Sequence, residues 1–291
     1  AGLTLVFGMM GIINFAHASF YMLGAYFAFT LGKVLGFFGA LVVAPALVGV
    51  IGIAAERFLL RPVHKYGHGS ELLMTFGIAI VFEELMKMIF GNYAVPYQVP
   101  EALRFSAFSL FGTDYPFYRI FVAATAGVLF LVLYLLLRRT RVGIVVRAAV
   151  QRPAMTGALG HNVDAVFMGT FGIGAWMAGI AGAVGGALLT TSPNMATEMA
   201  VLVFVVVVVG GLGSLGGAFV ASLLIGLLTS FAVRLDFSIA DIAGIVGMRD
   251  AVAAVGTLTT LNLASFATAI PVIVMLLVLL LRPAGIAGDR L

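Results

Sequence analysis

The stretch VFVVVVVGGLGSLGG, residues 203–217, joins a β-branched apolar run to a glycine-rich turn. Gly211, Gly213 and Gly216 have the G-x-G-x-x-G spacing of a dinucleotide-binding Rossmann fold. The helix expected next, AFVASLLIGLLTSFAV at 218–233, is apolar on every side, whereas a Rossmann helix needs a face for solvent. In a chain with 36 glycines this spacing also arises by chance, so the turn needs a different explanation.

The composition of the whole chain indicates a membrane protein. Of 291 residues, 62% are hydrophobic and 10% are charged, against roughly 25% charged in a soluble domain. The apolar residues gather in long runs that recur to the C-terminus, which excludes a signal peptide on a secreted domain. These runs are 37–60, 70–90, 119–137, 166–190, 199–233 and 266–281.

Lipid restricts the fold, because backbone groups in hydrocarbon must form their hydrogen bonds within the segment. The alternating pattern of barrel strands is absent from the sequence. We therefore predict an all-α polytopic helical bundle of about eight spans, forming a single transmembrane domain over residues 1–291.

The basic residues predict the orientation of the spans. Ten of the sixteen Lys and Arg residues fall in three regions, which we expect to be cytoplasmic. The opposite side then receives two external loops, at about 91–118 and 234–265. The net charge of +4 is a topology signal and not a nucleic-acid patch. The ten residues are Arg57, Arg61, Lys65, Arg138, Arg139, Arg141, Arg147, Arg152, Arg282 and Arg290.

This orientation places the glycine turn. If 166–190 runs outward and 266–281 returns inward, the run 199–233 begins and ends outside. Two legs of about 15 residues would each span roughly 23 Å, less than a 30 Å hydrocarbon core. The turn is then expected inside the membrane, where irregular backbone is tolerated only when protein buries it or it lines a cavity. Candidate pathway residues are Gly210, Gly211, Gly213 and Ser214; close packing of helices through small residues is the alternative.

A second break falls in the apolar segment at the start of the sequence. Residues 1–31 are interrupted by INFAHAS, residues 13–19, which leaves Asn14, His17 and Ser19 as polar candidates for the pathway. Paired broken segments in two pseudo-repeated halves are a sequence sign of a transporter path, and a broken helix's N-terminus is able to face a carboxylate. His17 is expected to line the path or to hold the broken turn through hydrogen bonds with Asn14 or Ser19. The alternative is a structural His17, satisfied by backbone carbonyls.

A basic amphipathic segment follows the run 119–137. In RTRVGIVVRAAVQRPAMTGALGHNV, residues 139–163, an apolar face lies beside arginines, and Pro153 is expected to break the helix. Such a helix suits a groove on a partner protein, or a place on anionic lipid headgroups. The apolar face comprises Val145, Val146, Ala149 and Val150.

Other chemistry is sparse. The chain has no cysteine, and none of its three lysines stands in a G-x-x-x-x-G-K-[ST] phosphate-binding loop. We expect Glu83 and Glu84 to pair with Lys87 within one helix; a proton relay is the alternative. No nucleophile with a neighbouring base is visible, so we predict no catalytic residue and no bound cofactor.

The four histidines have no spacing that gathers them into a metal site, so we predict no bound metal. His64, His68 and His161 fall in predicted cytoplasmic loops, where we expect them to be solvated. His17 is the exception, because it lies within an apolar run.

Several motifs together resemble one family. GLTLVFGMMGIINFAHASFYMLGAY, residues 2–26, resembles the N-terminal signature of LivH-type permeases, the membrane subunits of ABC importers for branched-chain amino acids and related compounds. Segment 139–163 is similar to the family's cytoplasmic coupling segment. GGLGSLGGAFVASLLIG at 210–226 and RPAGIAG at 282–288 are similar to its second broken helix and its C-terminus.

The sequence departs from the family pattern in three places. Members usually carry another helix before the Gly-Leu-Thr-Leu motif, so we expect that this sequence lacks the family's first segment, through truncation or through its numbering. Ala18 and Ser19 stand where glycine and an acidic residue are common. Loop 234–265 is longer than the resemblance implies.

The resemblance implies partners and a mechanism. Two separate ATP-binding subunits, which carry the ATP and Mg, would dock on a coupling segment within about 138–165. Also implied are a second permease subunit, more often a different chain than a copy, an extracytoplasmic solute-binding protein, and the lipid of the bacterial cytoplasmic (inner) membrane. The coupling residues implied are Arg141, Gly143, Arg147, Ala148, Gly160 and Asn162.

Such a permease would import a small solute by alternating access. A branched-chain amino acid or related amino acid, an amide or urea, and a small carboxylate all fit the resemblance. The alternative is an ATP-independent secondary transporter or channel, which broken helices suit equally well.

Overall fold

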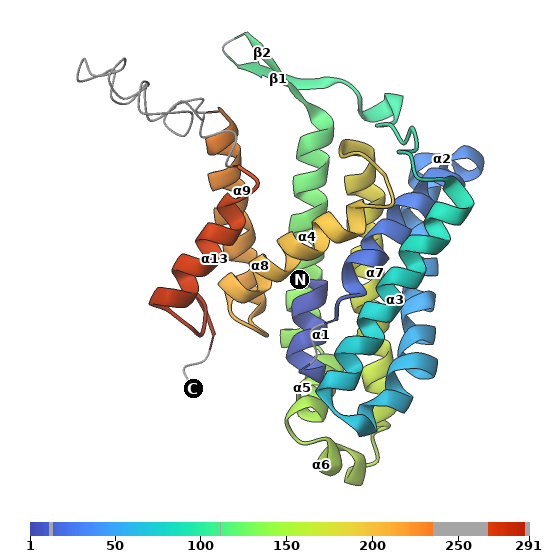
Figure 1. Cartoon of the computed structure of the whole chain (residues 1–291), viewed down its shortest axis with the longest axis vertical. Coiled ribbons are helices and arrows are strands. Elements are labelled where there is room, and N and C mark those ends of the chain that lie inside the picture. The colour runs from blue at the N-terminus through green and yellow to red at the C-terminus, as the bar shows by residue number, and fades with distance from the viewer. Residues whose placement is uncertain (12–13, 111, 235–266, 289–291) are drawn as a thin grey trace. The chain divides into compact units, whose positions relative to one another are not determined.

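The structure, a computed structural model, describes residues 1–11, 14–110, 112–234 and 267–288. The chain forms two compact units, Ala1–Val203 and Phe204–Leu291. Apart from one short hairpin, the described elements are helices (Figure 1), which confirms the all-α prediction. The predicted loop 234–265 lies, beyond Arg234, outside the described residues.

Unit 1 contains most of the described helices. Its elements are α1 (Gly2–Met10), α2 (His17–Ala55), η1 (Glu56–Leu60), η2 (Arg61–Tyr66), α3 (His68–Phe90), η3 (Glu101–Leu103), β1 (Ser106–Leu110), β2 (Thr113–Pro116), α4 (Phe117–Arg139), α5 (Arg141–Gln151), α6 (Pro153–Ala158) and α7 (Val163–Leu188). Helix α8 (Met195–Gly210) also begins in this unit. Among the described residues, four helical segments are long and apolar enough to span a membrane: His17–Tyr66, Phe117–Arg139, Val163–Leu188 and Leu215–Arg234.

Helix α2 is two helices that meet at Gly36, whose φ of 70° and ψ of 172° are not helical. The two halves run in opposite directions along α7. In the first half, His17 lies near Gly174 and Ala25 lies near Gly186. In the second half the order is reversed, with Val48 near Gly179 and Gly52 near Gly172. The hairpin therefore accounts for two of the predicted apolar runs.

Glycines allow α2 and α7 to touch through their backbones. A Cβ atom on Gly24 would run into the carbonyl of Gly179, and one on Gly182 would run into the carbonyl of Tyr21. Small residues also line the contact between both halves of α2 and α7, where Ala28, Ala40, Ala44 and Ala183 form a buried cluster. This is the close packing through small residues that membrane helices use in place of a hydrophobic driving force.

The two ends of unit 1 carry different connections (Figure 1). Helices α5 and α6 lie at one end, and the β1–β2 hairpin lies at the other. The basic segment that contains Arg61 meets Asp164 at the α5–α6 end, where Arg61 Nη2 donates to the Asp164 carbonyl over 3.0 Å. The segments 57–65 and 138–152, both predicted to be cytoplasmic, therefore share one end of the unit.

The opposite end is closed by loop 91–118. Tyr97 and Tyr118 donate hydrogen bonds from their hydroxyls to the α7 carbonyls of Ala183 and Val184, over 2.7 and 2.8 Å. Burial raises the pKa of the Tyr97 phenol, which keeps this donor protonated. The β1–β2 hairpin within the loop was not predicted. It turns at Gly112 (φ 76°), and its strands pair in antiparallel fashion.

Unit 2 contains the end of α8, α9 (Leu215–Arg234) and α13 (Ile270–Leu281). Its core joins α8 and α9 through Val205, Val209, Ala221 and Ile225, with α13 packed against them. The prediction that both legs of 199–233 are too short is wrong for α9, whose 20 residues reach about 30 Å at 1.5 Å per residue. The α8 leg, with 16 residues, is the short one.

The α2–α7 contact generates a prediction. Gly182→Val should destabilise unit 1, because the new side chain meets the Tyr21 carbonyl and overpacking costs about 1–3 kcal/mol or more. The measurement is the thermal midpoint of the detergent-solubilised protein. Gly169→Val is the matched control in α7, since a Cβ atom at Gly169 meets nothing within 4 Å. Equal midpoints for the two variants would contradict backbone contact at Gly182.

Candidate functional site

The first break separates α1 from α2. Helix α1 ends at Gly11, which has a φ of 67°, and α2 begins at His17. Between them Asn14 is buried, and its Oδ1 accepts a hydrogen bond from the backbone N–H of Ala16 over 3.0 Å. The amide nitrogen of Asn14 is buried without a partner. The Asn14 side-chain oxygen therefore holds the break, and the side-chain NH2 group is left as a buried donor without a partner.

His17 lies in a tight space between α1 and α7. A Cβ atom built on Gly2 would lie 3.0 Å from the imidazole Cε1 and Nε2, and one on Gly174 would lie 3.8 Å from Cε1. The Nδ1 of His17 is buried with no hydrogen-bond partner. Within the described residues the imidazole is therefore not bonded to Asn14 or Ser19, as one alternative had it. Ser19 is buried two residues further along α2.

The second break is the glycine turn between α8 and α9. Gly211 and Gly213 have φ of 98° and 84°, a left-handed conformation that glycine adopts without strain. Gly210 and Gly217 lie so close that a Cβ atom on either glycine would run into the backbone at or next to the other. Ser214 Oγ accepts a hydrogen bond from the Gly217 N–H over 3.1 Å, which caps α9.

Residues 282–288 cover this turn. The N–H groups of Ile286 and Ala287 donate to the carbonyls of Val209 and Gly210 over 2.8 and 3.1 Å. These bonds supply partners for carbonyls at the end of α8 that helix geometry leaves unpaired. Two motifs that the sequence shows far apart are therefore one structural feature, in which Gly210, Gly211 and Gly217 are buried while Gly213 stays exposed.

Segment 139–163, predicted to be the coupling segment, follows α4 with one residue, Thr140, between α4 and α5. Thr140 accepts a hydrogen bond from the Gly143 N–H over 3.1 Å and so caps α5. Gly143 is buried against the end of α4, where a Cβ atom would run into the Leu137 carbonyl. Arg147 donates a hydrogen bond to the same carbonyl. These contacts hold the angle between α4 and α5.

Helix α5 has a buried face and an exposed face. Gly143, Val146 and Ala149 are buried, whereas Arg141, Arg147 and Ala148 are exposed. Of the predicted apolar face, Val145 and Val150 are half-buried. Large apolar residues share the exposed surface of α5 and α6: Ile144, Met155 and Leu159 are 59%, 58% and 80% exposed.

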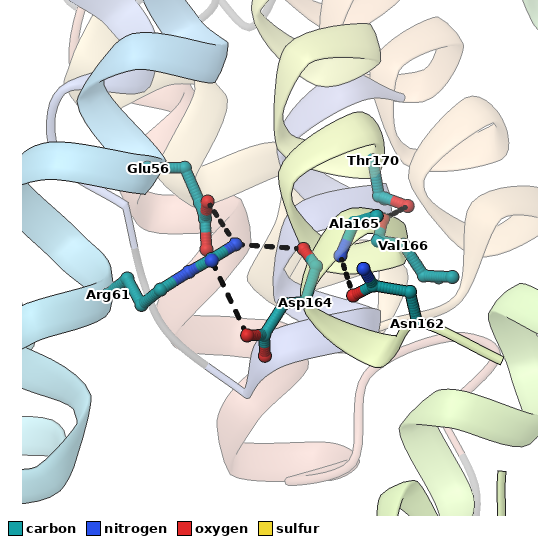
Figure 2. Close-up of polar contacts among 7 residues, drawn as sticks. All are labelled: Glu56, Arg61, Asn162, Asp164, Ala165, Val166 and Thr170. Carbon is teal, nitrogen blue, oxygen red and sulfur yellow. Dashed lines mark hydrogen bonds and ion pairs between the residues drawn. The ribbon is translucent and has the colours of Figure 1, made fainter. Parts of the chain in front are cut away.

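The end of the segment leads directly into α7. The helix breaks between Gln151 and Pro153, as predicted, and α6 follows. Gly160 has a φ of 86°. The Asn162 side chain accepts a hydrogen bond from the Ala165 N–H over 3.0 Å and caps α7 (Figure 2). Both ends of the segment are thus fixed to long helices, at Thr140 and at Asn162.

Two cavities are described in unit 1. One of about 420 Å³ lies behind α5, and its lining comes mainly from apolar residues of α4, α5 and α7. The other, of about 660 Å³, lies beside the β1–β2 hairpin and includes Arg104 and Arg119. Neither cavity is lined by Asn14, His17 or Ser19, so the pathway role of these residues stays a prediction.

The sequence analysis missed an ion-paired group at the α5–α6 end. Glu56, within the apolar run 37–60, has a side chain only 1% exposed and pairs with Arg61 over 3.4 Å. Arg61 also pairs with Asp164 over 3.4 Å. The sequence did hold a signal, because Glu56 stands near the end of an apolar run and Arg61 follows five residues later. From the sequence, Arg61 was used only to orient the spans.

His64 was wrongly predicted to be solvated. It contacts the buried carboxylate of Glu71, and its Nε2 is buried without a partner. His68 also contacts Glu71, over 3.1 Å, but remains 76% exposed. His161 is exposed as predicted. Among the described residues, no group of three or more His, Cys, Asp or Glu side chains has the arrangement of a metal site.

The predicted pairing within α3 is confirmed. Lys87 Nζ lies 2.9 Å from Glu83 and 2.8 Å from Glu84. Glu83 also accepts a hydrogen bond from the Thr197 hydroxyl over 3.2 Å. These contacts account for both carboxylates without a proton relay.

Comparison with known proteins identifies similar chains. Residues 1–281 match the family described as branched-chain amino acid transport system / permease component. The chain is 28% identical to the high-affinity branched-chain amino acid transport system permease protein BraD of Pseudomonas aeruginosa, over 99% of this chain and 89% of that protein. It is 31% identical to the corresponding LivH protein of Escherichia coli, over 78% of each chain.

An archaeal protein is similar as well. The probable branched-chain amino acid transport permease protein LivH of Methanocaldococcus jannaschii is 29% identical, over 78% of this chain and 73% of that protein. No solved structure shows significant similarity to the chain.

The covered turn generates a prediction. Gly211→Ala should destabilise unit 2, because a left-handed φ costs an L-residue about 1–2 kcal/mol and the new Cβ would lie 2.5 Å from the Gly288 nitrogen. Gly216→Ala, in the same turn region, meets nothing within 4 Å and is the matched control. Thermal unfolding of the purified protein measures both. A Gly211→Ala variant as stable as the control would mean that residues 282–288 do not cover the turn.

Proposed function

The chain belongs to the family of branched-chain amino acid transport system permease components, and from this membership we propose that it moves its solute by ATP-driven alternating access. Like its relatives, it is a transport permease subunit and not an enzyme. It is a multi-pass protein of the bacterial cytoplasmic membrane, and its described helices include four candidate spans. The earlier resemblance to LivH-type permeases is thereby confirmed.

The exposed surface of α5 and α6 supports docking of an ATPase subunit. This surface combines Arg147 with the exposed apolar residues Ile144, Met155 and Leu159. Apolar residues at the centre of a contact, with arginine beside them, are typical of protein interfaces. We place the ATPase contact here, with Arg141, Gly143, Arg147, Ala148, Gly160 and Asn162 as its residues or their immediate supports.

The attachments of the coupling segment support a mechanical role. At one end, Thr140 and the Gly143–Leu137 contact fix α5 to α4. At the other end, Asn162 caps α7. A displacement of α5 and α6 by closing ATPase subunits would therefore move α4 and α7 together. Movement of those helices would then open the path to one side of the membrane while closing it to the other side.

The first break supports a place for the solute. Asn14 and His17 keep buried polar nitrogens without partners at the start of α2. The positive end of a helix adds attraction for a carboxylate. We propose that Asn14, His17 and Ser19 line the path in unit 1. We propose Gly210, Gly211 and Gly213 as pathway residues of unit 2, where Gly210 lets α8 and α9 pack closely. Ser214 acts as the cap of α9.

We propose a branched-chain amino acid as the solute, because the relatives in two bacteria carry that name. An amide, urea or a small carboxylate is the next class to test. An extracytoplasmic binding protein would deliver the solute. Two ATP-binding subunits, carrying ATP and Mg, would work with this chain and a second permease subunit of different sequence.

The experiment that tests the assembly is gentle affinity purification of the full-length protein from its native membrane, followed by mass spectrometry. Recovery of ATP-binding subunits with a second permease chain supports the importer. Repeated recovery of this chain alone in mild detergent would instead favour an ATP-independent secondary transporter or channel, with α5 lying on the membrane surface.

The docking surface generates a prediction. Arg147→Glu should reduce uptake of radiolabelled leucine by roughly tenfold or more, because reversing an interface charge costs several kcal/mol. The amount of protein in the membrane is measured alongside, because Arg147 is exposed but also donates a hydrogen bond to the Leu137 carbonyl. Lys33→Glu, a charge reversal at an exposed position near the opposite end of unit 1, is the matched control. Undiminished uptake by Arg147→Glu would remove Arg147 from the contact.

A further inference from the structure

A buried carboxylate lies where the α2 hairpin ends. Glu56 begins η1, and its side chain is 1% exposed. Arg61, at the start of η2, lies 3.4 Å from Glu56 Oε2 through its Nη2 atom (Figure 2). A carboxylate at this depth needs a charged partner, because burying an unpaired charge is costly.

The same guanidinium reaches α7. Arg61 Nη1 lies 3.4 Å from Asp164 Oδ2, and Arg61 Nη2 donates to the Asp164 backbone carbonyl over 3.0 Å (Figure 2). Arginine suits this task, because its planar group offers several donors in a fixed geometry. Arg61 therefore joins the end of α2 to the first turn of α7, across 103 residues of sequence.

This connection lies next to the coupling segment. Asn162, which caps α7, precedes Asp164 by two residues (Figure 2). The connection from α6 to α7 contains Gly160, which has a φ of 86° and whose N–H donates to the Gly157 carbonyl over 3.0 Å, so α6 ends in a tight bonded turn. The Asn162 cap and this turn fix how α6 leads into α7, and Arg61 adds a contact from the start of α7 to the end of the α2 hairpin.

Stability alone does not explain the arrangement. Replacing a buried ion pair by apolar residues is often neutral or stabilising, so such a pair is weak evidence of a stabilising role. Its value here is geometric, because it fixes one helix end to another at three acceptor atoms: Glu56 Oε2, Asp164 Oδ2 and the Asp164 carbonyl oxygen.

We propose that Arg61 is a positioning residue for coupling, which clamps the first turn of α7 to the end of the α2 hairpin. Through this clamp, movement of the coupling segment is passed to the two halves of α2 as well as to α7. The inference rests on the proposed ATP-driven function. It adds to that function the route by which the movement reaches both halves of α2.

The test uses the purified complex of this chain with its co-purifying subunits, reconstituted in liposomes with its binding protein. It measures ATP hydrolysed per leucine imported, together with thermal stability. In Arg61→Gln the ratio should rise by roughly threefold or more, because changes along a coupling route act on this scale. Arg61→Lys should give a smaller rise, because a lysine ammonium keeps the ion pair with Glu56 but does not bond to Glu56 and Asp164 at once, as the planar guanidinium does.

The double variant Glu56→Gln/Arg61→Gln separates clamping from neutralisation. It removes the buried charge together with its partner, so stability should recover relative to Arg61→Gln. The ATP-to-leucine ratio should nevertheless stay raised, because the link to Asp164 is still missing. Lys87→Gln, which removes an ion-paired cation of α3 elsewhere in unit 1, is the control and should leave the ratio unchanged.

Two results would overturn the clamp alone. One is a coupled wild-type complex whose ratio is the same in Arg61→Gln. The other is a double variant whose ratio returns to the wild-type value along with its stability, which would show that Arg61 only neutralises Glu56. Failure of the proposed function is distinct, because the wild-type complex itself would then import leucine without ATP hydrolysis, and the clamp would fall with it.

Discussion

The backbone contact between α7 and the two halves of α2 is the constraint on which unit 1 depends. Lipid tails are as apolar as leucine, so burying leucine against leucine gives membrane helices little reason to associate. Glycine at positions 24, 179 and 182 instead brings carbonyls of one helix against the backbone of the other. The three helical segments are thereby held at a separation that larger side chains would not allow.

The ends of this core position the rest of the unit. At one end, the tyrosine hydroxyls of loop 91–118 bond to carbonyls at the C-terminal end of α7. At the other end, Asn162 and Arg61 fix the start of α7 to the coupling segment and to α2. Helix α7 thus connects the predicted cytoplasmic and external surfaces, and each surface is tied to it by polar contacts with its backbone.

The amino-acid sequence predicts those features that depend on composition and local spacing. The long apolar runs define the fold class, the break at Pro153 follows from a missing N–H, and the Lys87 pair follows from helical periodicity. Features that join distant residues were missed. Neither periodicity nor spacing shows that Arg61 meets Asp164 or that 282–288 covers the glycine turn, because both contacts depend on how helices pack.

Helix lengths show the same division. The sequence places a turn at 210–217 and a helix over 218–233, but it did not show that α9 already begins at Leu215, within that turn, which makes α9 long enough to span the membrane. The reversal at Gly36 was likewise marked only by Lys33 nearby, and a single glycine in a chain rich in glycine carries little information.

The cover over the glycine turn has a consequence for biosynthesis. A ribosome completes residues 282–288 after α8, α9 and α13, so the carbonyls of Val209 and Gly210 are made long before the N–H groups that bond to them. During translation these carbonyls must be bonded to water or to the insertion machinery, since hydrocarbon offers no partner. Unit 2 therefore cannot finish folding before residues 282–288 have been synthesised and have docked on the turn.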